Sequence, residues 1–248
     1  MHQAIVLIPL YKPTLDGFEQ YSVDHSLNAL RNREVFFICP EGLDISYYIE
    51  RYPNYHCRSY APHYFESIIG YNHLLLSEFF YSDYLDYEFM LILQTDAIVL
   101  HDKLAMWCTQ PFDYIGAPWP NGLELFVNLG TFQGENGRRV RATVGNGGLS
   151  LRRNKKCIAI LKEFPEATDY FLRSGSSEDL FFSFMGPLST DFVLPNEITA
   201  SRFSLELKPS FYYAINGEHL PMGGHAWWKY DMDFWRKVLP LSSLLDVL

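Results

Sequence analysis

A continuous apolar run, Phe89-Met90-Leu91-Ile92-Leu93, leads directly into Gln94-Thr95-Asp96, and a second apolar run, Ala97–Leu100, follows. A short apolar run of this kind predicts a strand that is buried on both faces. An ionised aspartate at its end is costly to bury unless it meets a metal, a cation or several hydrogen-bond donors. Ligands of open α/β sheets bind beyond the carboxyl ends of strands, so Asp96 is a candidate binding residue. The alternative is that Asp96 caps a turn.

Two similar runs precede this stretch. Ala4–Ile8 is closed by Pro9, and Glu34–Cys39 ends at a Pro-Glu-Gly sequence. Between and after them, the patterns predict helices over Phe18–Asn32 and Glu66–Tyr81. Buried strands that alternate with helices predict an α/β fold with a mostly parallel central sheet flanked by helices.

The second half of the chain has a different pattern. Its Gly, Asn and Pro content predicts a long loop over Pro118–Gly137, and loops of that length are usually functional. The sequence Gly145-Asn146-Gly147-Gly148 is typical of a hairpin turn. The alternative is close approach of a substrate to bare backbone. The remaining predicted elements are short strands at Arg138–Val144 and Leu149–Arg152 and helices at Lys155–Phe164 and Ser177–Met185.

Composition excludes two broad classes. Apolar residues make up 48% of the 248 residues and charged residues 20%, so the chain can bury a core and is not disordered. The net charge of −9 argues against nucleic-acid binding, which depends on a basic surface. Aromatic residues reach 17%, which suits a cleft that stacks sugar rings, although most of them are expected to pack the interior.

The cysteines and the apolar runs bear on location. The four cysteines lie far apart and form no CxxC pair, which excludes a zinc knuckle and a dense disulfide framework and predicts a reducing compartment. The sequence begins without the pattern of a signal peptide, and its longest apolar runs are too short to cross a bilayer. We therefore expect a cytoplasmic protein, at most peripheral to the inner face of the membrane. The cysteines are Cys39, Cys57, Cys108 and Cys157.

An acidic pair opens one of the predicted helices, in the sequence Ser176-Ser177-Glu178-Asp179-Leu180. Serine followed by acids is a common helix start, because the helix dipole favours negative charge there. A carboxylate on the first turn is also held rigidly, as a general base must be. We expect neighbouring backbone amides to lower the pKa of Asp179, which would make it a weak base whose value lies in its position.

A histidine near the C-terminus is a second candidate. His225 follows two glycines and precedes Trp227 and Trp228. A lone histidine is more often structural than a ligand, and adjacent tryptophans usually pack in the core. One of the tryptophans can nevertheless line a sugar-binding cleft.

Basic residues are concentrated in one segment, which holds seven of the 20 in the chain. Such a cluster predicts a local positive field that steers a phosphorylated ligand or contacts anionic lipid. The alternative is the solvated face of a hairpin. The seven residues are Arg138, Arg139, Arg141, Arg152, Arg153, Lys155 and Lys156.

These motifs, in this order, resemble the GT-A class of nucleotide-sugar glycosyltransferases. Within that class they are similar to a bacterial group with a QTDA strand end, an NGGLS loop and an SEDLFF helix start. The resemblance runs from the strand ending at Pro9 to His225-Ala226-Trp227. It implies one GT-A-like domain over residues 1–248, with a nucleotide-binding half at 1–115 and a catalytic, acceptor-side half at 116–248.

The resemblance also implies roles for individual residues. The first strand end contacts the nucleotide, the QTD segment takes the place of the DxD motif on the donor diphosphate, the glycine loop borders the donor and acceptor sugars, and the SED segment supplies the catalytic base. The implied nucleotide contacts are Pro9, Leu10, Tyr11, Gln94, Thr95 and Asp96; the sugar contacts are Asn146, Gly147, Gly148 and Trp227; the catalytic acids are Asp179 and Glu178; and the metal ligands are Asp96 and His225.

One position departs from the GT-A pattern. Gln94 replaces the first aspartate of DxD, so one charged metal ligand is missing. Mg²⁺ often binds through one or two carboxylates plus substrate phosphates, so Asp96, His225 and the diphosphate can suffice for Mn²⁺ or Mg²⁺. Metal independence, with basic residues neutralising the diphosphate, is the alternative.

The implied activity is transfer of a hexose-type sugar from a nucleoside-diphosphate donor to a hydroxyl group. Among the possible donors, a UDP-sugar is favoured. The expected acceptor is a glycan or a lipid-linked molecule in polysaccharide or lipopolysaccharide assembly, and the expected stereochemical course is inversion. A non-catalytic carbohydrate-binding protein on a degenerate GT-A fold is the main alternative. A nucleotidyltransferase has less support, since no phosphate-cradling glycine motif follows the first strand.

Overall fold

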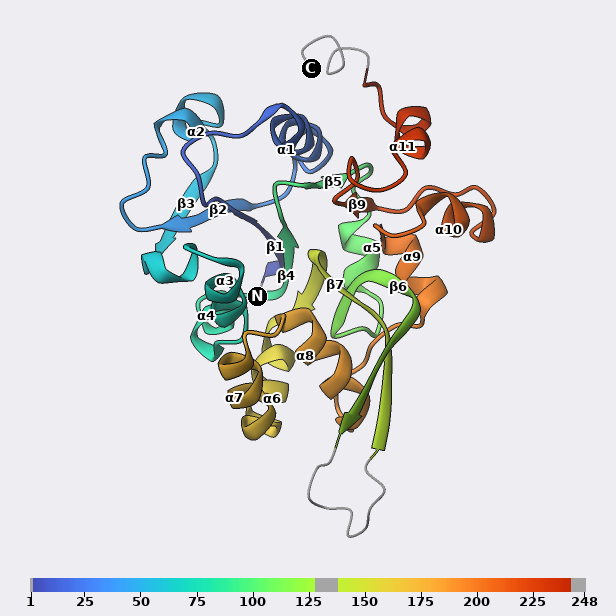
Figure 1. Cartoon of the computed structure of the whole chain (residues 1–248). Helices are drawn as coiled ribbons and strands as arrows, with labels where there is room; N and C mark the ends of the chain where they lie inside the picture. Colours follow the sequence, from blue (N-terminus) through green and yellow to red (C-terminus); the bar gives the residue numbers. More distant parts are fainter. Residues whose placement is uncertain (1, 128–137, 242–248) are drawn as a thin grey trace.

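Four parallel strands form most of a six-stranded sheet in the computed structural model, which describes residues 2–127 and 138–241. The strand order is β3-β2-β1-β4-β7-β6, and β7 runs antiparallel to both of its neighbours (Figure 1). The predicted mostly parallel α/β sheet is therefore confirmed. The strands of this sheet are β1 His2–Pro9, β2 Val35–Pro40, β3 His56–Tyr60, β4 Tyr87–Leu93, β6 Tyr114–Val127 and β7 Arg138–Arg153.

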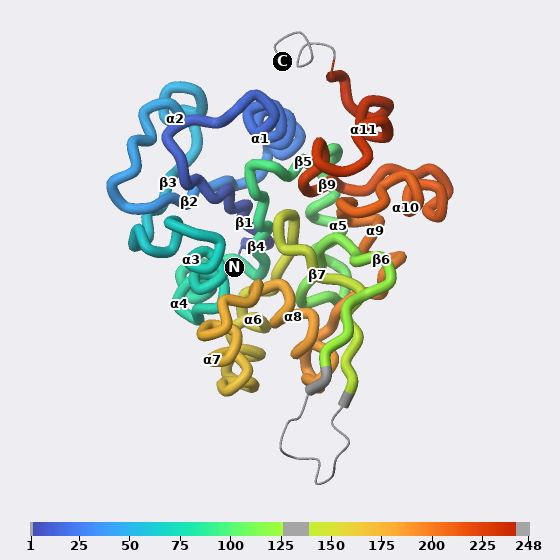
Figure 2. The backbone as a smooth tube through the Cα atoms, viewed as in Figure 1, coloured from blue at the N-terminus to red at the C-terminus, as the bar shows by residue number. Residues whose placement is uncertain are grey.

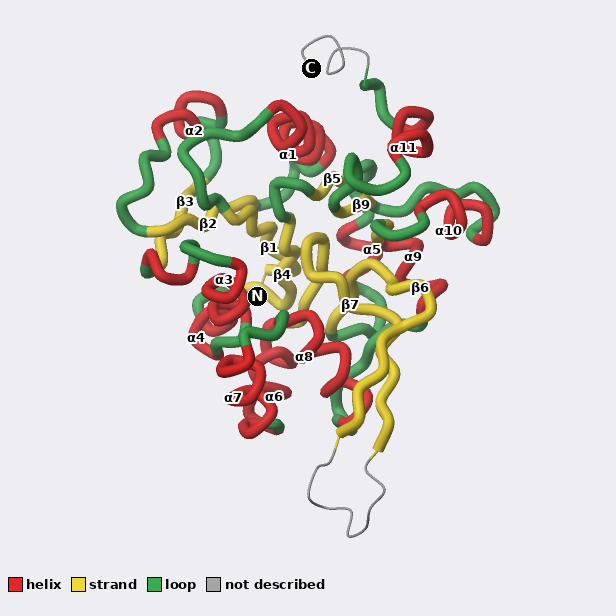
Figure 3. The backbone as a smooth tube through the Cα atoms, in the orientation of Figure 1, coloured by secondary structure: helices red, strands yellow, loops and turns green. Residues whose placement is uncertain are grey.

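Helices lie on both sides of the sheet (Figure 3). Side chains alternate along β1, so Ile5 and Leu7 contribute to one apolar cluster and Val6 and Ile8 to another. The first cluster includes side chains of α3, α4, α6, α7 and α8, and the second includes side chains of α1, α2 and α5. The helices are α1 Gly17–Ala29, α2 Ser46–Arg51, α3 Ile68–Leu75, α4 Glu78–Ser82, α5 Leu104–Cys108, α6 Asn154–Glu163, α7 Pro165–Ser174, α8 Glu178–Met185, α9 Glu197–Phe203, α10 Pro209–Ile215 and α11 Met232–Val238.

The β6–β7 ribbon corrects two predictions. Residues 118–127 belong to strand β6 rather than to a loop, and residues 128–137 of the predicted loop lie outside the described part of the chain. Strand β7 is continuous over 16 residues, so the glycine segment 145–148 is not a hairpin turn. Long-range pairs such as Leu125 with Val140 hold the ribbon, and register shifts between Ile115 and Leu123 accommodate its Pro and Gly residues. The ribbon extends away from the rest of the molecule (Figure 2).

The predicted helix over Glu66–Tyr81 is two helices. Helix α3 ends with Leu76 as its C-cap, and Ser77 is the N-cap of α4. Serine favours helix ends over helix interiors, which explains the break within an otherwise helical pattern.

A second, three-stranded sheet has the order β5-β9-β8 and was not predicted. It pairs Ala97–Val99 of β5 with Gly223–His225 of β9, and thereby places the end of the QTD segment beside His225. Strand β8, Ser204–Leu205, pairs with the other edge of β9. Strands of two or three residues leave no periodic signal in a sequence. Among the described residues, none of the helices has the length and apolar character needed to span a bilayer.

Candidate active site

Asp96 lies three residues beyond the last residue of β4, in the position expected for a ligand-binding residue of an α/β sheet. Its turn is fixed by two backbone hydrogen bonds, from Gln94 N to Gly148 O at 2.9 Å and from Ala97 N to Gln94 O at 2.9 Å. The Asp96 carbonyl accepts a hydrogen bond from Ala226 N, also at 2.9 Å. Ala226 has a φ of +47°, a conformation that a non-glycine residue rarely adopts. This strained turn places His225 and Lys229 beside the Asp96 carboxylate.

The Asp96 carboxylate lies among cations. His225 Nε2 is 3.1 Å from Asp96 Oδ1, and Lys229 Nζ is 2.8 Å from Asp96 Oδ2. Burial acts to raise the pKa of Asp96, but His225 and Lys229 outweigh it and hold this pKa well below its ordinary value. Asp96 is therefore ionised at all physiological pH values.

His225 lies between two carboxylates. Its Nδ1 atom is 3.3 Å from Glu206 Oε1, and Glu206 also accepts a hydrogen bond from Asn146 Nδ2. Burial acts to lower the pKa of His225, but the neighbouring carboxylates of Asp96 and Glu206 raise it to about 9. Glu206 thus orients both the imidazole ring of His225 and the glycine segment 145–148.

The two glycines of the NGG segment make close contacts on opposite sides of β7. A Cβ atom on Gly148 would lie 2.1 Å from His225 Nε2, and one on Gly147 would lie 2.6 Å from Glu178 Oε1. Both distances are shorter than real Cβ contacts, so a larger residue at either position would displace the His225 or the Glu178 side chain. Successive residues of a strand face opposite ways, which places one acidic cluster on each side of this segment.

Asp179 lies on the first turn of α8 and reaches the same segment. Its Oδ2 atom accepts a hydrogen bond from Gly147 N at 3.3 Å, and its Oδ1 atom accepts one from Leu180 N at 2.7 Å. Burial, and after it the charge of Glu178, raises the pKa of Asp179 to about 7, although both amides act in the opposite direction. The expectation of a lowered pKa is therefore wrong: desolvation outweighs the two amides.

Glu178 forms a buried ion pair with Arg152. The distance from Arg152 Nη2 to Glu178 Oε1 is 2.6 Å, and the Arg152 side chain is 0% exposed. Arg152 also donates hydrogen bonds to Tyr81 Oη and Ser150 Oγ. Because Glu178 is committed to this pair, the structure places it behind Asp179 and not where the expected catalytic acid would meet a substrate.

A cavity of about 430 Å³ opens beside Asp96. Five of the six predicted nucleotide contacts line it, and the sixth, Leu10, is 1% exposed and packs in the core. The segment 65–72 forms the opposite wall. The lining residues are Pro9, Tyr11, Phe65, Glu66, Ser67, Ile68, Tyr71, Asn72, Gln94, Thr95 and Asp96.

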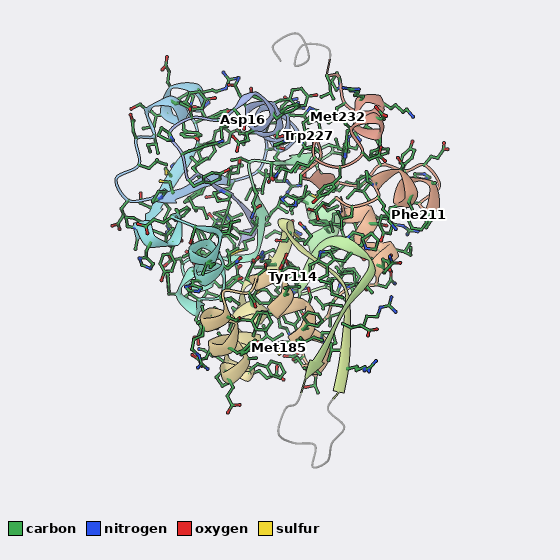
Figure 4. All side chains as sticks on the ribbon, viewed as in Figure 1. Asp16, Tyr114, Met185, Phe211, Trp227 and Met232 are labelled. Atoms are coloured by element: carbon green, nitrogen blue, oxygen red, sulfur yellow. The ribbon has the colours of Figure 1, made fainter. Side chains whose placement is uncertain are left out.

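Trp227 does not line a cleft, so its expected contact with a sugar is wrong. It is 0% exposed, and its indole N–H donates a hydrogen bond to Ser22 Oγ at 2.8 Å. It packs between α1 and α11, against Phe18 and Trp235 (Figure 4). A satisfied N–H and complete burial are the ordinary state of a core tryptophan.

Three residues of the site were missed at the sequence level. Glu19 accepts hydrogen bonds from Tyr11 Oη and Thr95 Oγ1, both at 3.1 Å. It thereby links the residues that follow β1 to those that follow β4 in the lining of the cavity. The spacing of Asp16 and Glu19 signals the capping box that begins α1, but not this second role. Glu206 lies in a segment without clear periodicity, and Lys229 follows His225 by four residues, a spacing that by itself does not indicate a contact with Asp96.

Three of the seven residues of the predicted basic cluster are paired with acids. Arg152 pairs with Glu178, Arg153 with Glu88 and Asp113, and Lys156 with Asp191. The side chain of Arg138 lies outside the described part of the structure. The segment is therefore not a continuous positive surface.

A protein-family model matches residues 54–225, which include Asp96, the glycine segment, Asp179 and His225. Its description is "Protein of unknown function (DUF5672)". The chain belongs to the DUF5672 family. No curated protein matches this DUF5672 chain in sequence.

Solved structures resemble the DUF5672 chain in fold. The galactosyltransferase LgtC, in complex with donor and acceptor sugar analogues, is 15% identical, with a TM-score of 0.53 over 89% of this chain and 86% of that one. An active-site mutant of LgtC matches with the same identity and coverage and a TM-score of 0.52. The glycosyltransferase GlyE of Streptococcus pneumoniae TIGR4, in its apo form, is 12% identical, with a TM-score of 0.50 over 99% of this chain and 62% of that one. At such identities the likeness establishes a GT-A fold for the DUF5672 chain and nothing finer.

Proposed function

We propose that this protein is a glycosyltransferase that moves a hexose-type sugar from a nucleoside diphosphate, a UDP-sugar above others, to a hydroxyl group. One observation carries the proposal. The ionised Asp96–His225 cluster and the half-buried Asp179 contact adjacent positions of one glycine segment at the carboxyl end of β4, and Asp96 lines a cavity. This is where a GT-A fold can bind a nucleotide sugar and a second substrate together.

In the proposed mechanism Asp179 is the general base. The acceptor oxygen attacks the anomeric carbon and forms the new glycosidic bond, the bond from that carbon to the diphosphate oxygen breaks, and the acceptor proton passes to Asp179. A pKa of about 7 suits this role, because a base is most effective when its pKa is close to the working pH. Attack opposite to the leaving group inverts the anomeric configuration. The hydrogen bond from Gly147 N holds the carboxylate in place.

The departing diphosphate needs positive charge, and the residues near Asp96 offer two sources. Asp96 Oδ1 and His225 Nε2 are close enough to share one divalent cation, and Glu206 orients the ring as metal-binding histidines require. The described residues contain no cluster of three or more such ligands, so the remaining ligands of the cation would be diphosphate oxygens and water. When bound, Mn²⁺ or Mg²⁺ would neutralise charge on the leaving group. Lys229 supplies a positive charge at the same carboxylate.

The acceptor in this proposal is a glycan or a lipid-linked molecule, as in polysaccharide or lipopolysaccharide assembly. The alternative is a non-catalytic carbohydrate-binding protein on the same fold. Gln94 favours it, because the glutamine contributes no charge where GT-A enzymes carry the first DxD aspartate.

Thermal unfolding in the presence of UDP, GDP, CDP and their sugar conjugates, each with and without Mn²⁺, tests donor binding. A ligand that binds only the folded state at 100 times its Kd raises the free energy of unfolding by about 2.7 kcal/mol, a measurable shift. Release of free nucleoside diphosphate without acceptor then separates an enzyme from a binder. If wild type and Asp179→Asn both bind a sugar nucleotide but neither releases nucleoside diphosphate, the result would support the non-catalytic alternative. If no nucleotide raises the melting temperature, the proposal is wrong.

A further inference from the structure

The cavity beside Asp96 has two walls, and the proposed function uses only one. Pro9, Tyr11 and the QTD segment form the nucleotide wall, whereas residues 65–72, at the start of α3, form the other. We infer that Tyr71 and Asn72 form the subsite for the transferred sugar, and that this subsite takes an uncharged sugar. The inference rests on the proposed function, because it concerns the donor bound at the same cavity.

Tyr71 and Asn72 carry polar groups that no other described residue satisfies. Tyr71 Oη is buried and has no hydrogen-bond partner in the described part of the chain. Asn72 is 4% exposed, lines the cavity, and makes no side-chain hydrogen bond to another described residue. Buried polar groups are almost always paired, so the unpaired Tyr71 Oη, next to the Asn72 amide in the cavity wall, indicates a group kept for a ligand.

The Tyr71 phenol is a donor over the whole physiological range. Burial raises the pKa of Tyr71 far above its ordinary value, although the guanidinium of Arg152 acts to lower it. A neutral phenol and a neutral amide together offer donors and acceptors to sugar hydroxyls, and neither carries a charge.

The position of Tyr71 favours the sugar over the nucleotide. The charges of Arg152 and Glu178 both act on its phenol, so it lies on the side of the cavity that faces α8, the helix that carries Asp179. Helix α3 also contacts α8. The anomeric carbon must approach the base, whereas the nucleotide is expected at the strand end that carries Pro9 and Tyr11. The α3 wall is thus the side on which the sugar has to lie.

The charges of the cavity exclude an acidic sugar. Its lining contains no lysine, arginine or histidine, and of its two carboxylates that of Asp96 is paired with His225 and Lys229 while that of Glu66 is exposed. Arg152, the buried cation on the Tyr71 side, is committed to Glu178. A sugar carboxylate would therefore find no cation in the lining to pair with, and burying an unpaired charge is strongly unfavourable. Hydroxyl groups meet no such cost.

Isothermal titration of the full chain with UDP, UDP-glucose, UDP-galactose and UDP-glucuronic acid, in the presence of Mn²⁺, tests the inference, with GDP and GDP-mannose as the second nucleotide series. In wild type we expect a neutral sugar conjugate to bind more tightly than the free diphosphate, and UDP-glucuronic acid to bind at least about tenfold more weakly than the best neutral conjugate. Tyr71→Phe and Asn72→Leu should each weaken the sugar conjugate about 3- to 10-fold and leave the free diphosphate unchanged.

Tyr71→Phe removes only the unpaired oxygen, so the melting temperature without ligand should not fall, and this variant stays informative if Asn72→Leu does not fold. The matched control is Tyr21→Phe, since Tyr21 Oη is also buried without a described partner but does not line the cavity. Equal weakening of diphosphate and conjugate, unchanged binding in both variants, or tightest binding of the glucuronic acid conjugate would overturn the subsite while leaving the proposed function intact. Absence of binding by every nucleotide would overturn both.

Discussion

Asp96 and Asp179 reach the same glycine segment, yet their surroundings differ in charge and in hydration. Asp96 pairs with His225 and Lys229, so its pKa is far below the ordinary value and its charge is permanent. Asp179 is half-buried and has a second carboxylate beside it, so desolvation and the charge of Glu178 raise its pKa to about 7. A permanent anion suits a structural or metal-binding role, whereas an acid that titrates near neutrality suits proton transfer. The difference assigns the two proposed roles more sharply than the motifs do.

The largest expected effect is that of a substitution at Asp179, which tests its role as the general base. Asp179→Asn should lower turnover about 10²- to 10⁴-fold, because the amide cannot accept the acceptor proton. Initial-rate kinetics with donor and acceptor measure this change, and donor affinity should stay the same. Near-wild-type turnover in the folded variant would show that Asp179 is not the base.

Stability provides a check on the same variant. The folded-state pKa of Asp179 lies above its unfolded value, so the native state binds more protons than the unfolded chain at pH values from about 4 to 7, and stability falls as the pH rises through that range. Asp179→Asn should therefore melt at a higher temperature than wild type at pH 8, with no difference below pH 4. The matched control is Asp169→Asn, an exposed acid on α7.

The next largest effect concerns the buried pair behind Asp179. Arg152→Met leaves Glu178 buried without a partner, which should cost about 3–5 kcal/mol of the free energy of unfolding. Urea denaturation measures the loss. Arg173→Met, at an exposed pair, is the control and should change stability by less than about 0.5 kcal/mol. A similar small change in both variants would mean that the pair does not hold the base in place.

A third test concerns the Asp96 side. If a divalent cation is shared by Asp96 and His225, Asp96→Asn should weaken UDP binding in Mn²⁺ at least about tenfold, and should not weaken it in EDTA. Titration calorimetry under both conditions separates the two cases, with Asp102→Asn, a surface partner of Arg33, as the control. Should Mn²⁺ leave the UDP affinity of wild type unchanged, Lys229 and the protonated His225 would supply the charge, and Lys229→Met would then weaken UDP binding in EDTA.

The smallest expected effect is a shift in pH dependence. Turnover should rise with pH through the pKa of Asp179, about 7, because only the carboxylate accepts a proton. Glu178→Gln removes the neighbouring negative charge, so the midpoint of the kcat/KM profile should move to lower pH. A shift in the opposite direction, or none, would mean that burial alone sets the pKa of Asp179. The profile reports the pair of acids as a coupled unit.

Local patterns predicted the parallel core. The apolar runs ending at Pro9 and Leu93 form neighbouring strands because buried parallel strands need residues that are apolar on both faces. The same reasoning placed Asp96 beyond its strand and Asp179 on the first turn of its helix. It did not predict strand β6, where pairing with the following strand, β7, offsets an unfavourable local composition.

The amino-acid sequence by itself determined the α/β layering and the positions of Asp96 and Asp179, because apolar periodicity and helix-start signals are local properties of the chain. Only the tertiary structure decided that Glu206 and Lys229 join His225, that Trp227 packs in the core and that Arg152 holds Glu178. It also decided the proton affinity of Asp179, since a pKa depends on burial and neighbouring charge, and chain folding brings both from segments far apart in the sequence.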